Sequence, residues 1–233
     1  MTIKSLAVGV VAIGMVALAA TSASAANLIT NGNFTNGSDG LTGWTLTGNP
    51  TGDHQDTAVI DYTTGDPFPS GAFGEAVPQQ SEPSPTAVYF VTDVPVNVSL
   101  TQDYTTNSAG NYTISFDYYT PGNGRANPLD GNLVVSNDDA VLTDIDIKHT
   151  NSGLGWYTFS TTTFLAGGNN TLTFLFSVDG NVPGTPTQTA ADILVTNVAV
   201  TGGVPEPATW GMLLVGFFGL GAFVRHRSHV QIA

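Results

Sequence analysis

Strict alternation of apolar and polar residues is the feature that most constrains how this chain can fold. In segment 111–119, every second residue from 112 to 118 is tyrosine, isoleucine or phenylalanine, and the residues between them are threonine, serine and aspartate. In segment 172–178, leucine, phenylalanine and valine likewise recur at every second position. Because successive side chains of a β-strand point to opposite faces, this period predicts strands with one buried face.

Eight further segments carry strand signals, and glycine, asparagine and proline lie between them. These segments are 44–47, 58–62, 87–92, 96–104, 132–136, 141–147, 155–164 and 193–201. No window between them has a convincing helical period. Many short strands joined by turns predict an all-β domain over 26–203, a β-sandwich of the jelly-roll-like type.

Two long connections, 63–85 and 120–130, and a shorter one, 179–189, are rich in proline and glycine. Proline lacks a backbone donor, so these segments are loops, either functional or simply variable surface. Sugar binding needs aromatic platforms and planar polar groups, which the first two loops and their borders contain. The candidate ligand-binding residues are Phe68, Phe73, Tyr89, Arg125 and Asp130. The alternative is that the aromatic residues pin the loop and the arginine makes a surface ion pair.

The N-terminus has the three parts of a secretory signal peptide. Lys4 provides a positive start, 6–20 is apolar and rich in small residues, and Ala23 and Ala25 form an A-x-A cleavage pattern. Residues 1–25 are therefore predicted to be a signal helix that is removed during export.

The C-terminal segment, 204–230, combines prolines, an apolar run and basic residues. The 17 residues at 208–224 would span about 25 Å as a helix, close to a thin bilayer core of about 27–30 Å. Arg225 and Arg227 follow at once, and the positive-inside rule assigns them to the cytoplasm. The sequence predicts a single transmembrane helix, with the sandwich outside the inner membrane and Trp210 at the outer interface.

Two prolines flank Glu206 and keep this segment extended, a shape that a processing enzyme can grip. Together with the tryptophan and the basic end, they resemble the PEP-CTERM sorting signal, also called the ice-binding protein C-terminal domain; Gly211 replaces the alanine of one subtype. The residues concerned are Val204, Pro205, Glu206, Pro207, Trp210, Arg225 and Arg227. The resemblance implies an exosortase-type enzyme of the inner membrane that cuts the tail, so that the anchor is temporary. It also implies a Gram-negative bacterium that makes extracellular polysaccharide and carries the protein at its surface.

A second resemblance covers most of 27–201. The opening 27–34 and Trp44 look like the first strand of galactose-binding-like sandwiches, and the strands predicted above resemble the middle and later ones. Related carbohydrate-binding sandwiches often hold a structural calcium ion near that first strand. In this sequence the corresponding positions are Thr35 and Thr196, which carry no charge, so no metal is expected.

Composition narrows the function further. The chain has 18 acidic and 5 basic residues, a net charge of −13 that disfavours nucleic acid as a partner, and no cysteine. Asp138, Asp139, Asp144 and Asp146 cluster but match no calcium loop, and the last two alternate with isoleucine as on a solvated strand face. No catalytic motif is present.

We expect a non-catalytic exported protein of the cell surface or matrix, without cofactor or metal. The alternatives are a carbohydrate-binding module in the exopolysaccharide matrix and a secreted hydrolase.

Overall fold

The computed structural model of the chain describes residues 26–48, 55–61, 84–92, 95–120, 131–147, 156–178, 191–202 and 216–218. All the strands belong to one compact unit, Ala25–Gly203. The predicted signal peptide lies outside the described residues. The same is true of the C-terminal segment, except for 216–218, which are helical.

No helix within the described ranges is both long and apolar enough to cross a membrane.

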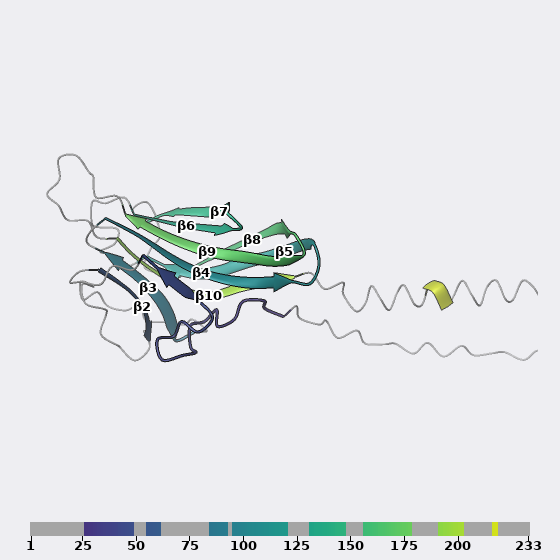
Figure 1. Cartoon of the computed structure of the whole chain (residues 1–233), viewed down its shortest axis with the longest axis horizontal. Helices are drawn as coiled ribbons and strands as arrows, with labels where there is room; N and C mark the ends of the chain where they lie inside the picture. Colours follow the sequence, from purple (N-terminus) through teal and green to yellow (C-terminus); the bar gives the residue numbers. More distant parts are fainter. Residues whose placement is uncertain are drawn as a thin grey trace, which may run out of the picture. The chain divides into compact units, whose positions relative to one another are not determined.

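Within the described ranges, ten strands form two antiparallel sheets of five strands each (Figure 1). One sheet has the order β1-β4-β9-β6-β7 and the other the order β2-β3-β10-β5-β8. The strands are β1 (Thr45–Thr47), β2 (Gln55–Asp61), β3 (Thr86–Thr92), β4 (Val96–Thr106), β5 (Gly110–Tyr119), β6 (Gly131–Asn137), β7 (Ala140–Asp146), β8 (Tyr157–Leu165), β9 (Gly168–Val178) and β10 (Ala191–Gly202). The predicted β-sandwich is confirmed, and each of the ten predicted strand segments overlaps one of these strands.

The core lies between the two sheets and is built by the alternation seen in the sequence. In β5 the side chains of Tyr112, Ile114 and Phe116 are buried, and in β9 alternate residues from Asn170 to Val178 are buried. Phe116 and Phe174 meet edge to face across the core, with ring centroids 5.2 Å apart. Burial of apolar surface at about 25 cal/mol per Å² is the main term that holds such a sandwich together.

The sheet that contains β3 and β10 also carries apolar residues on its second face. In β3, Ala87, Tyr89 and Val91 alternate with core residues and are themselves buried, together with Leu194 of β10. A strand that is buried on both faces has a continuous run of apolar residues in its sequence, and residues 87–91 form such a run.

The prediction of a first strand at 27–34 is wrong. Asn27 alone makes an isolated bridge, to Thr201, and the residues that follow form turns. Asn31 and Phe34 have φ angles of 54° and 56°, in the left-handed region, which interrupts an extended strand. This N-terminal segment instead lies against β10, where Val198 N donates a hydrogen bond of 2.8 Å to Gly32 O.

Two short turns meet at one end of the sandwich (Figure 1). Asn137, at the end of β6, pairs with Leu172 near the start of β9, and β9 follows β8 directly through Ala166 and Gly167. The β6–β7 turn and the β8–β9 turn are therefore neighbours, although about thirty residues separate them in sequence. The adjoining edge strands are β7 of one sheet and β8 of the other.

Candidate functional site

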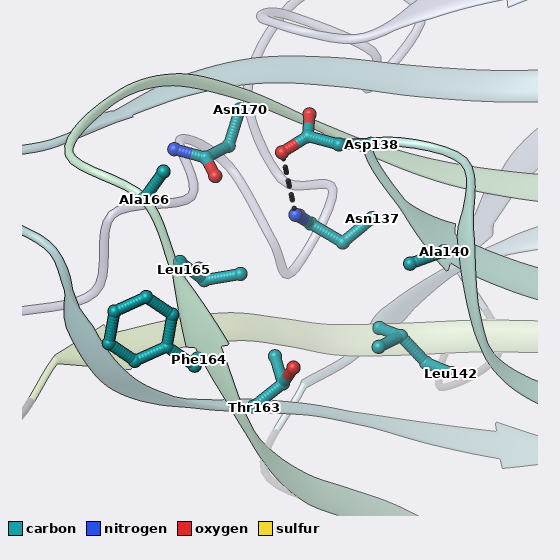
Figure 2. Close-up of a pocket in the computed structure, with 9 residues that line it drawn as sticks. All are labelled: Asn137, Asp138, Ala140, Leu142, Thr163, Phe164, Leu165, Ala166 and Asn170. Carbon is teal, nitrogen blue, oxygen red and sulfur yellow. Dashed lines mark hydrogen bonds between the residues drawn. The ribbon is translucent and has the colours of Figure 1, made fainter.

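The edge strands β7 and β8 and the two turns beside them enclose a pocket of about 170 Å³ (Figure 2). Its polar lining residues are Asn137, Asp138, Thr163 and Asn170. Its apolar lining residues are Ala140, Leu142, Phe164, Leu165 and Ala166. In Figure 2 the two asparagines and the aspartate gather on one side, and Leu165, Leu142 and Phe164 lie on the other. The pocket thus has one polar and one apolar wall.

Asp138 is held in place by the turn that contains it. Asp138 and Asp139 both have positive φ, 46° and 64°, as the two central residues of a tight type I′ hairpin turn require. The Asp138 backbone N–H donates to Thr171 O at 3.0 Å, and the Thr171 N–H donates to Asp138 Oδ1 at 2.8 Å. Asn137 Nδ2 donates to Asp138 Oδ2 at 3.1 Å. The carboxylate is therefore fixed while its residue remains exposed.

Asn137 is oriented by a buried tyrosine of β4. The Tyr104 hydroxyl donates to Asn137 Oδ1 at 2.6 Å. Burial raises the pKa of Tyr104 well above its usual value, and the nearby Asp138 and Tyr112 raise it further. The hydroxyl therefore stays protonated and keeps donating, so both polar atoms of the Asn137 amide are used inside the protein.

Asn170 is a polar lining residue whose amide nitrogen has hydrogen-bond partners in the protein and whose amide oxygen has none among the described residues. Its Nδ2 donates to Thr106 Oγ1 at 3.1 Å and to Gly168 O at 2.9 Å, which accounts for both amide hydrogens. Thr106 in turn donates to Ala166 O at 2.6 Å. Oδ1 accepts no hydrogen bond from the described residues, and Figure 2 shows it turned toward the pocket. The residue is 2% exposed, and this oxygen is its free acceptor on the pocket side (Figure 2).

Phe164 gives the pocket an exposed aromatic rim. Its side chain is 68% exposed, whereas the neighbouring Leu165 is buried. Burial alternates along β8, and Phe164 shares the exposed positions with Thr158, Ser160 and Thr162. An aromatic ring on an otherwise hydroxyl-bearing strand face is the sequence signal that could have identified this site.

The sequence-predicted ligand residue Tyr89 lies elsewhere. It is 2% exposed in β3, its hydroxyl donates to Asp192 Oδ2 at 2.9 Å, and it packs in a cluster with Tyr119 and Leu194. Phe68, Phe73, Arg125 and Asp130 lie outside the described residues. So do the predicted signal-cleavage residues and the predicted sorting residues of the tail, which all stay predictions.

A second pocket, of about 340 Å³, lies between the N-terminal segment and β10. Its residue Asn27 holds the N-terminal segment against β10: Asn27 Nδ2 donates to Val198 O, and Asn27 Oδ1 accepts from the backbone N–H groups of Ile29 and Val200.

Thr196 is one of the two positions that correspond to the calcium site of related sandwiches. Its hydroxyl donates to Thr86 O at 2.7 Å. Within the described ranges no three histidine or acidic residues are grouped so that they could hold a metal ion.

No family model matches the sequence, and no curated protein matches it. Among solved structures, TmCBM61 in complex with beta-1,4-galactotriose is 12% identical, and the match covers 76% of this chain and 99% of that one with a TM-score of 0.51. This chain shares the β-sandwich fold of that structure. A family 35 carbohydrate-binding module from an environmental isolate is 17% identical over 50% of this chain and 78% of that one, with a TM-score of 0.31. The Lys-gingipain adhesin domain of Porphyromonas gingivalis W83 is 14% identical over 79% and 98%, with a TM-score of 0.43.

Proposed function

We propose that this chain is a non-catalytic carbohydrate-binding protein that acts outside the cell, in an exopolysaccharide matrix. The support is the fold shared with a carbohydrate-binding module together with a pocket that has one polar and one apolar wall. A pyranose ring presents the same division, with C–H groups on its faces and hydroxyl groups around its edge. The proposal includes the jelly-roll-like arrangement that the sequence predicts.

The observation that carries the proposal is the exposed ring of Phe164 beside the acceptors Asp138 and Asn170. An exposed phenylalanine gains contact area when a sugar face covers it, and burying such a side chain is worth about 1.5–3 kcal/mol. The neighbouring acceptors can then receive the hydroxyl hydrogens of the same sugar. The arrangement suits binding, since the described pocket residues include no histidine, lysine or pair of carboxylates.

Replacing Phe164 with alanine should weaken polysaccharide binding about tenfold, because part of the stacking energy is lost. Affinity electrophoresis or calorimetry of the full-length protein with a panel of neutral polysaccharides measures this. Val141→Ala is the matched control, since Val141 is 64% exposed on β7 and does not line the pocket. The proposal fails if the wild-type protein binds none of these polysaccharides, or if it shortens them. If only Arg125→Ala weakens binding, the site is instead the predicted loop site.

We also propose that the C-terminal segment delivers the protein to the surface, as its PEP-CTERM resemblance implies. The exosortase-type enzyme would act near Val204–Pro207 while the apolar run holds the chain in the inner membrane. Changing Pro205 and Glu206 together to alanine should leave the full-length protein in that membrane, and fractionation with intact-mass measurement checks this. Normal release of the double variant would rule out the sorting proposal.

A further inference from the structure

We propose that the pocket between β7 and β8 binds one uncharged sugar residue at a chain end or side-branch tip, and excludes acidic sugars. This inference rests on the proposed function and adds the class of ligand and the way it enters. It stands on three observations: the size of the pocket, the absence of a positive charge among its lining residues, and the surplus of acceptors on its polar wall.

The size of the pocket limits the ligand to one ring. Its volume is about 170 Å³. An apolar cavity of about 150 Å³ is known to accommodate one benzene ring, and drug-sized ligands need about 300–1,000 Å³. A di- or trisaccharide therefore exceeds the space, and the residue that enters must be one whose remaining chain can stay outside. A terminal residue meets this condition, whereas an internal residue is linked on both sides.

The polar wall offers more hydrogen-bond acceptors than donors. Asn170 Oδ1 accepts no hydrogen bond from the described residues, and each Asp138 carboxylate oxygen accepts one and has room for another. Both Asn170 amide hydrogens donate within the protein, and one Asn137 amide hydrogen donates to Asp138 Oδ2. Among the described lining side chains, the Thr163 hydroxyl and the second Asn137 amide hydrogen remain as donors. The matching ligand is therefore a donor of hydrogen bonds, which a sugar hydroxyl is and a carboxylate is not.

The orientation of the Asn170 amide is locked by its neighbours. A flip would turn Nδ2 toward the pocket and Oδ1 toward Gly168 O, which cannot donate. It would also remove the hydrogen bond from Nδ2 to Thr106 Oγ1, whose own hydrogen is directed at Ala166 O. The Asn170 acceptor is thus a fixed feature of the pocket, and a ligand group that covers it without donating a hydrogen bond loses binding free energy.

Charge adds to this selectivity. Asp138 is a carboxylate at the pocket, none of the described lining residues is basic, and the whole chain has a net charge of −13. A uronic acid whose carboxylate faced this wall would meet a like charge, and that carboxylate could not donate to the acceptors there. Because Asp138 is exposed, we expect solvent to moderate this repulsion to about a tenfold difference in affinity.

The first test compares methyl glycosides of glucose, galactose and mannose with the methyl glycoside of the corresponding uronic acid, by NMR titration of the full-length protein at neutral pH. At least one neutral sugar should bind about tenfold more tightly than its acidic counterpart, and 1 M salt should reduce the difference because the Debye length falls to about 3 Å. Asp138→Asn should also reduce it, since asparagine tolerates a positive φ. Equal binding of the neutral and acidic members of every pair overturns the inference.

Blocking the pocket gives a second, independent variant. Ala140 lines the pocket from the exposed first position of β7, so Ala140→Trp should fill it without disturbing the core, and binding should be lost. Val141→Trp is the matched control, because Val141 is exposed on the same strand and is not among the lining residues. Unchanged binding by Ala140→Trp contradicts the inference.

Entry by a chain end is tested with one polysaccharide before and after partial acid hydrolysis. At equal mass, the number of binding sites should rise in proportion to the number of new chain ends. If it does not rise, chain-end recognition is wrong although the proposed function stands. If neither polysaccharide nor monosaccharide binds, the proposed function fails together with the inference.

Discussion

Replacing Phe174 with alanine should lower the free energy of unfolding by about 3–5 kcal/mol. Phe174 lies in β9, the central strand of its sheet, and its side chain is fully buried. Its ring centroid is 6.0 Å from that of Trp44 and 5.2 Å from that of Phe116. The substitution would remove the ring that packs against both Trp44 and Phe116, and a close-packed core closes such a cavity only in part.

Denaturant unfolding followed by tryptophan fluorescence measures this effect. Phe164→Ala is a matched control, because it removes the same ring from a position that is 68% exposed. Surface substitutions of this kind usually change stability by no more than about 0.5 kcal/mol. Equal losses of stability in the two variants would contradict the assignment of Phe174 to the core.

The strands could be predicted from the sequence because buried and exposed side chains alternate along each of them. Residues 112–118 and 172–178 alternate in sequence, and the structure buries the same alternate positions in β5 and β9, except that Tyr118 is only partly buried. Asp144 and Ile145 show the same rule on a smaller scale, since the aspartate is exposed and the isoleucine is buried. In these strands the period of two is enough to predict which side chains are buried, because successive side chains of a pleated strand point to opposite faces of the sheet.

The N-terminal segment shows where this reasoning fails. Residues 27–34 contain apolar residues near Trp44, as a first strand would, but their conformation is set by contacts with distant residues. Thr30 N–H donates to Gln102 Oε1 and Thr30 O accepts from Gln102 Nε2. A Cβ added to Gly32 would come within 1.9 Å of Val198 O, so only glycine fits against β10 there. Neither partner can be inferred from the segment itself.

The pocket was missed for a related reason. Its polar wall depends on a hydrogen bond between Asn170 and Thr106, which are 64 positions apart, and its two turns come from different hairpins. The sequence places Asp138 in an acidic cluster and includes Phe164 in a strand, and both statements hold. That these residues line one pocket follows only from the pairing of β6 with β9, which sequence periodicity does not specify.

Replacing Asn31 with aspartate should destabilise the protein by about 3–5 kcal/mol, although the two side chains have nearly the same shape. Asn31 Nδ2 donates to the backbone carbonyl oxygens of Asn36, Gly40 and Thr42, at 3.3, 2.8 and 3.1 Å. Its Oδ1 accepts from the Asn36 N–H at 3.0 Å. A carboxylate would place a second oxygen, with negative charge and no hydrogen to donate, against three carbonyl groups at a buried position.

Denaturant unfolding followed by tryptophan fluorescence also measures the stability of the Asn31→Asp variant. Trp44 Nε1 donates to the Asn31 backbone oxygen at 3.1 Å, so its fluorescence reports on this network directly. Asn33→Asp is the matched control, since Asn33 is exposed two residues away and its Oδ1 only accepts, from Thr35 at 3.1 Å. The deficit of Asn31→Asp should shrink as the pH is lowered, because a protonated carboxyl group is uncharged and can donate again. If both variants unfold at the wild-type denaturant concentration, the Asn31 amide is not what holds the N-terminal turns together.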